Sequence, residues 1–159
     1  MDNKEFSQER LESEVSSRET LENSEFNPTA TLKYFNDRRS EFYYLIENLN
    51  ISGVSPQLAE SLATQFLQGM NRVNAILLDV SNHLILFEKV RDVELSLAGA
   101  ASGEKSVAAQ ERAAVLMPKY QFAESCYQQI KNLKEYYSNV YTMFDRGHVM
   151  YKNLALDKK

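Results

Sequence analysis

The fold of this chain is decided by AESLATQFLQGMNRVNAILLDVSNHLILF, residues 59–87, in which apolar residues recur at alternating intervals of four and three. This spacing is typical of a helix that packs along its length against another helix. Residues 123–154 repeat the pattern. The two seams consist of Ala59, Ala63, Phe66, Met70, Val73, Leu77, Val80, Leu84 and Phe87, and of Ala123, Cys126, Ile130, Leu133, Tyr137, Val140, Phe144, Gly147, Tyr151 and Leu154. Two long helices with matching seams and a short connection predict one antiparallel hairpin.

Composition supports an all-α fold in one domain. The chain has 159 residues, of which 43% are hydrophobic and 25% charged, as in an ordinary folded domain. Its 5 glycines and 3 prolines are too few for the many turns of a β-sandwich or barrel. Residues 1–26 are rich in Glu, Ser and Asn and lack an apolar stripe. We therefore predict an acidic flexible N-terminal arm over residues 1–26 and a helical hairpin domain over residues 27–159.

Two cap-and-proline pairs predict where the first two helices begin. Asn27 and Ser55 are each followed by proline, which suits the N-cap and first helical positions. The first helix, about twenty residues long, is amphipathic and is the shorter one. The second begins at Pro56, and its apolar pattern extends to Leu97. Residues 50–54 between them contain Gly53 and predict a turn.

The second half of the hairpin is expected after a small-residue loop over residues 98–105. Helix resumes near Ser106 and is broken or kinked by Pro118. The second long helix then runs to about residue 154. Gly147 within it marks either a bend or a close approach by another segment.

Residue types that carry catalysis are scarce. The chain has two histidines, His83 and His148, and a single cysteine, Cys126, which lies on the second seam. No metal-binding motif and no nucleophile–base pair is visible in the sequence. We therefore expect no enzyme activity, no cofactor and no metal. The polar start and the absence of a long apolar run predict a cytoplasmic protein, in the host cytoplasm if the chain is viral.

The last forty residues interleave tyrosines with basic residues. Six of the nine tyrosines lie there, and this combination suits single-stranded nucleic acid, because bases stack on rings while cations meet phosphates. The candidate DNA-binding residues are Lys119, Lys131, Lys134, Arg146 and Lys152.

The same region also suits a protein interface, because a tyrosine ring can be buried while its hydroxyl stays hydrated. A second apolar row beside the first seam indicates that the long helix contacts two neighbours, either the first helix or another subunit. The candidate interface residues are Leu86, Val90, Val93, Tyr137, Tyr141, Phe144 and Tyr151. We expect a homo-oligomer. In a ring of subunits, the weakly basic surface of each chain would be repeated, so that several copies could bind one polyanion together.

Residues 85–155 resemble the recombination mediator proteins of T4-like tailed bacteriophages. The similarity lies in a long helix, a small-residue loop and a second long helix closing with Asp145-Arg146-Gly147-His148, followed by Lys152. The matching residues are Arg146, Gly147 and Lys152. The resemblance implies a ring-forming helical protein that binds single-stranded DNA and helps load a recombinase. Unlike that family's pattern, this chain has no tryptophan and a net charge of −4.

Two other interpretations stay open. The stretch from Ser55-Pro56 through Leu62, Met70 and Leu77 is similar to the central helix of phage small terminase subunits, which implies a DNA-packaging role. The third interpretation is a virion structural or scaffolding subunit without DNA contact. Strand preference and oligomeric mass distinguish the three.

Overall fold

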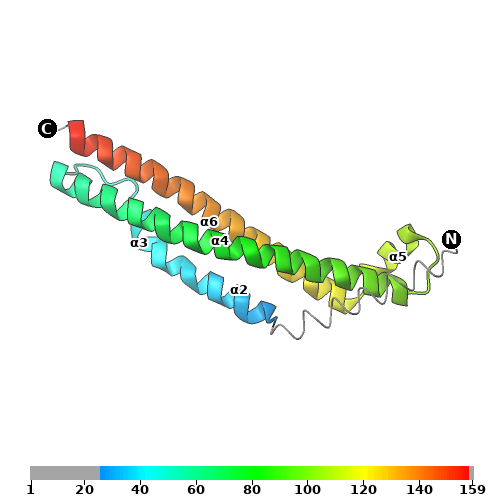
Figure 1. Ribbon diagram of the computed structural model, residues 1–159. Coiled ribbons are helices and arrows are strands. Elements are labelled where there is room, and N and C mark those ends of the chain that lie inside the picture. The colour runs from blue at the N-terminus through cyan, green and yellow to red at the C-terminus, as the bar shows by residue number, and fades with distance from the viewer. Residues whose placement is uncertain (1–25, 158–159) are drawn as a thin grey trace. The chain divides into compact units, whose positions relative to one another are not determined.

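The computed structural model describes residues 26–157, which are helical with short connections and contain no strand. The elements are α2 (Pro28–Asp37), the 3₁₀ helix η1 (Arg38–Phe42), α3 (Tyr43–Glu47), α4 (Pro56–Ala101), α5 (Val107–Ala114) and α6 (Pro118–Asp157) (Figure 1). The all-α fold with two long helices is confirmed. The arm expected over residues 1–26 lies outside the described residues, apart from Phe26.

The described chain forms two compact units. One contains residues 26–32 and 83–131, and the other contains residues 33–82 and 132–157. Both long helices contribute a segment to each unit, so each unit is described separately below.

In the second unit, α4 and α6 run antiparallel. A Cβ atom on Gly69 would lie 3.1 Å from the ring of Phe144, and one on Gly147 would lie 3.1 Å from the ring of Phe66. A step of three residues backward along α4, from Gly69 to Phe66, thus moves the contact three residues forward along α6, from Phe144 to Gly147. The Phe66 ring stacks on Tyr151 at 5.6 Å and meets Phe144 edge-on at 5.5 Å. The predicted antiparallel pairing of the seams is confirmed here.

In the first unit, the same two helices meet through polar and aromatic contacts. The Arg91 guanidinium on α4 lies 4.2 Å from the ring centroid of Tyr127 on α6, and its Nε is 3.7 Å from a Glu124 oxygen. The short helix α5 returns beside the end of α4, where Gly99 lies against Gln110. These contacts close the hairpin around the loop after Ala101.

In the second unit, two tyrosines of α6 bind the part of the chain that contains the end of α2, η1 and α3, which we call the N-terminal helical segment. The Tyr137 hydroxyl donates to the Phe35 carbonyl at the end of α2, and the Tyr151 hydroxyl donates to the Asn48 carbonyl just after α3, at 2.5 Å. Carbonyls at helix C-terminal ends lack intrahelical partners, which makes them natural acceptors. Phe42, buried between these anchors, contacts both Tyr137 and Phe144. The segment therefore forms a third helical layer on the α4–α6 pair.

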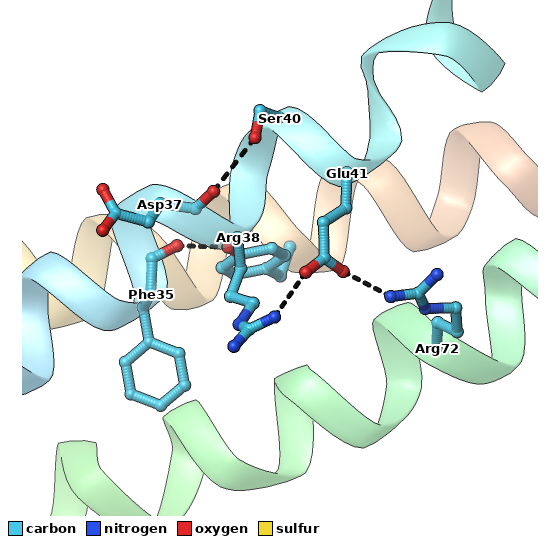
Figure 2. Close-up of polar contacts among 7 residues, drawn as sticks. Phe35, Asp37, Arg38, Ser40, Glu41 and Arg72 are labelled. Carbon is cyan, nitrogen blue, oxygen red and sulfur yellow. Dashed lines mark hydrogen bonds and ion pairs between the residues drawn. The ribbon is translucent and has the colours of Figure 1, made fainter.

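One carboxylate links this segment to α4. Glu41 accepts from Arg38 at 2.5 Å and from Arg72 of α4 at 2.6 Å, as Figure 2 shows. The ring of Tyr34 lies under Arg38 at 4.6 Å. Because these groups are partly exposed, the contacts fix the position of η1 more than they stabilise the fold.

The helix starts agree with the sequence. The side-chain oxygens of Asn27, Ser55 and Ser106 accept from the backbone N–H groups three residues later, at 3.0, 3.1 and 3.1 Å. Each polar side chain thereby satisfies one of the orphan donors of its first turn.

Two boundaries differ from the prediction. Helix α4 continues through residues 98–101, which were expected in the loop, because three of these four residues are alanines, the strongest helix formers. The expected single helix over residues 28–49 changes to 3₁₀ geometry at η1. At Gly147 the structure decides between the two expected alternatives: α6 continues without a break, and Leu49 and Phe66 approach closely where a side chain is missing.

The tyrosine anchors make a prediction about stability. Tyr137→Phe removes a buried hydrogen bond and keeps the ring, so the free energy of unfolding should fall by about 1 kcal/mol. Tyr141→Phe, on the same helix but exposed, is the matched control and should change it by less than about 0.5 kcal/mol. Urea unfolding followed by circular dichroism measures both. Equal effects of the two variants would contradict the anchoring role.

Alkaline pH should weaken the same anchor. Burial raises the pKa of Tyr137 well above the usual tyrosine value near 10. The folded state therefore prefers the neutral phenol. The contribution of neutral Tyr137 to the free energy of unfolding is complete below about pH 10 and is lost as the pH rises further. The stability difference between wild type and Tyr137→Phe should accordingly shrink above about pH 10. Thermal melting at a series of alkaline pH values tests this; a constant difference would rule it out.

Candidate nucleic-acid interface

The five candidate DNA-binding side chains are all exposed on α6. They make no ion pair with any of residues 26–157, whereas Lys33, Arg38, Arg72 and Arg91 outside α6 each pair with a carboxylate. Cations without an internal partner are free to neutralise an external anion. The candidates divide between the two units, with Lys119 and Lys131 in the first and the other three in the second.

Within the second unit, part of the candidate set shares one face of α6. We call this face the α6 stripe. Its residues alternate at intervals of four and three, the spacing that keeps side chains on one side of a helix. They are Lys134, Ser138, Tyr141, Asp145, His148 and Lys152. Arg146 lies one position beyond Asp145, on the adjoining flank.

The α6 stripe offers two cations around one aromatic ring. Tyr141 is 36% exposed and has no aromatic or cation–π partner within residues 26–157. Lys134 and Lys152 lie about 10 and 16 Å from it along the helix axis, at 1.5 Å per residue. Asp145 places one negative charge between them. His148, near the far end, is oriented by a 2.8 Å contact of its Nδ1 with the Ala63 carbonyl oxygen, and since a carbonyl can only accept, Nδ1 is the donor.

Most other tyrosines of this region already have partners inside the chain. Arg91 covers the Tyr127 ring, and Arg39 lies 4.2 Å from the ring centroid of Tyr136. Tyr137 and Tyr151 are completely buried. The sequence pattern of aromatic and basic residues therefore reflects intrachain packing at four of its six tyrosines.

The candidate interface residues also separate into groups. Tyr137, Phe144 and Tyr151 are 0% exposed in the core of the second unit, where they pack against Phe66 and the N-terminal helical segment. A role for them between subunits would require this core to open. Leu86, Val90 and Val93 belong to the first unit, where Val90 and Val93 line an apolar cavity together with Lys119. Tyr141 is the one member of the set that is exposed.

An exposed apolar turn was not singled out by the sequence. Val115, Leu116 and Met117, between α5 and α6, are 45, 73 and 39% exposed. Three consecutive exposed apolar side chains are unusual on a monomer surface and typical of an interaction site. In the sequence these three residues directly precede Pro118, so the pattern predicts them as the last turn of a helix that the proline ends.

Other kinds of site find no support in the described part of the chain. Between residues 26 and 157, no group of three or more His, Cys, Asp or Glu side chains is arranged to hold a metal ion. Over the same residues, no helix carries an apolar stretch long enough to cross a membrane. The chain matches no protein-family model, and comparison with curated proteins and with solved structures finds no match either.

The position of the stripe predicts that its charges are dispensable for folding. Lys134→Glu and Lys152→Glu alter exposed side chains without internal ion pairs, so each should change the free energy of unfolding by no more than about 0.5 kcal/mol. Val140→Ala, completely buried on the same helix, should lower it by about 1–3 kcal/mol and is the matched comparison. Thermal melts of the three variants test the assignment. Strong destabilisation by either lysine substitution would place that lysine in the fold rather than in a binding face.

Proposed function

We propose that this chain is a non-catalytic, self-associating helical protein that binds single-stranded DNA and acts with a recombination partner as a recombination mediator. The observation that carries the DNA part is the α6 stripe, on which Lys134 and Lys152 flank the exposed ring of Tyr141 without an internal ion pair. Bases stack on an exposed ring, and phosphates meet the flanking cations.

Single strands fit this stripe better than duplex. The aromatic contribution requires an unstacked base, which a single strand supplies at no cost in base pairing. Stacking on a ring is also tolerant of sequence, because every base has a π-face. The proposal is therefore one of binding without sequence specificity.

Self-association is needed for useful affinity. One chain contributes two cations on the stripe, together with the nearby Arg146, and the formal net charge is −4. Several copies on one strand convert weak contacts into an avid complex, because each later contact is intramolecular. The exposed turn of Val115, Leu116 and Met117 supports a contact between copies.

The recombination partner is proposed from the resemblance to phage mediators alone. Of the residues that match that family, Gly147 has a packing role in this chain, because Leu49 and Phe66 occupy the space above it. Arg146 and Lys152 are exposed and carry the proposed similarity of function.

Fluorescence anisotropy with labelled oligothymidine tests the DNA contact. Lys134→Glu combined with Lys152→Glu should weaken binding and lower the slope of log K against log salt by about 1.4, since each phosphate contact to a single strand contributes about 0.7. The matched control is Lys105→Glu with Arg112→Glu, which changes the net charge equally in the loop before α5 and in α5 itself. The control should bind like wild type after correction for overall charge.

The same experiment separates the other interpretations. Tighter binding to duplex than to oligothymidine favours a packaging subunit over a mediator. A defined oligomer by light scattering that binds neither nucleic acid at low salt favours a structural subunit. Equal losses in the stripe variant and its control would also contradict the proposal, because binding would then follow net charge alone.

A further inference from the structure

The first unit contains an apolar cavity of about 420 Å³. Helix α4 contributes Phe87, Val90 and Val93 to its wall, and α6 contributes Phe122, Ala123 and Cys126. Val93 and Cys126 are buried, while Phe122 is 56% exposed at the rim. If only water fills a cavity of this size, its apolar lining stays hydrated. An apolar side chain in the cavity would remove that surface from water and add packing contacts.

The N-terminal chain enters the described part of the protein at this cavity. Phe26, the first described residue, is itself part of the lining, and its ring meets Phe87 edge-on at 5.2 Å. Pro28 also lines the cavity and begins α2. The residues immediately before Phe26 are covalently joined to a residue of the lining. Their effective concentration at the cavity is therefore in the millimolar range.

The composition of residues 19–25, ETLENSE, matches this surface. Leu21 is the one large apolar residue in this stretch, and four residues lie between it and Phe26, so the two Cα atoms are at most about 17 Å apart. The stretch also carries Glu19, Glu22 and Glu25. On the protein side, Lys119 lines the cavity, and Lys89 lies one turn before Val93 on α4. Neither lysine pairs with a carboxylate among residues 26–157. Glu94 is the acidic residue of the lining.

We propose that residues 19–25 dock onto the first unit, with Leu21 in the apolar cavity and their glutamates beside Lys89 and Lys119. This inference goes beyond the proposed function and does not depend on it. It makes the cavity a binding site for the chain's own N-terminal segment. One consequence is that Lys119 becomes available to an external anion when the segment leaves.

The single cysteine of the chain provides a direct readout, because Cys126 lines the cavity. In the full-length protein, Leu21→Ser should speed the reaction of Cys126 with a small thiol reagent about tenfold, as expected when one buried leucine contact is lost. Leu11→Ser, the same change outside the docked segment and nearer the N-terminus, is the matched control and should react like wild type. Burial raises the pKa of the Cys126 thiol, so mildly alkaline buffer keeps the rates measurable.

Equal labelling rates for wild type, Leu21→Ser and Leu11→Ser would overturn the proposal. A rate that falls with increasing protein concentration and ignores Leu21→Ser would assign the cavity to a second copy of the chain and would likewise overturn it. Unchanged melting temperatures establish that faster labelling does not reflect unfolding. As a second measurement, the chain has no tryptophan, so Leu21→Trp and Leu11→Trp each introduce a single fluorophore. Acrylamide should quench the first more slowly than the second, and equal quenching would contradict docking.

Discussion

The second unit depends on the donation of two buried tyrosine hydroxyls to helix-end carbonyls. Tyr137 and Tyr151 lie fourteen residues apart on α6, four turns along one face, and bind the carbonyls of Phe35 and Asn48. Each tyrosine satisfies its own polar atom and an acceptor at the end of a short helix, so burial leaves neither group unpaired. This arrangement explains why α6 carries tyrosine at seam positions where a two-stranded coiled coil would carry leucine.

Gly69 of α4 and Gly147 of α6 belong to the same arrangement. Gly69 leaves room for Leu45 and Phe144, and Gly147 leaves room for Leu49 and Phe66. A glycine within a helix costs about 1 kcal/mol relative to alanine. Here that cost is offset by aromatic packing that a Cβ atom would obstruct. The N-terminal helical segment can therefore approach both long helices closely enough for the tyrosine hydroxyls to reach its backbone.

Use of aromatic residues in the core limits which surfaces are available for function. Most tyrosines of the C-terminal region either are buried or lie under an arginine, which leaves Tyr141 as the exposed ring of the α6 stripe. The first unit contains in addition an apolar cavity lined by residues of α4 and α6, and the exposed turn of Val115, Leu116 and Met117. Exposed apolar side chains occur in both units: Leu78 and Leu156 are 61 and 55% exposed in the second, and Leu116 is 73% exposed in the first.

The sequence by itself determined the all-α class, the starts of three helices and the antiparallel pairing of two seams, because periodicity and capping are local properties of the chain. It also located the exposed cations of α6, since charged residues off a seam face solvent. The seam put Tyr137 and Tyr151 on the packing face of α6, but only the tertiary structure decided that segments of the same chain bury them. It also decided how the near neighbours Tyr136, Tyr137 and Tyr141 differ. Their environments differ by which segment packs over each: Arg39 covers Tyr136, and the end of α2 accepts the hydroxyl of Tyr137. The cavity was equally beyond sequence reasoning, since its wall combines side chains from three separate segments.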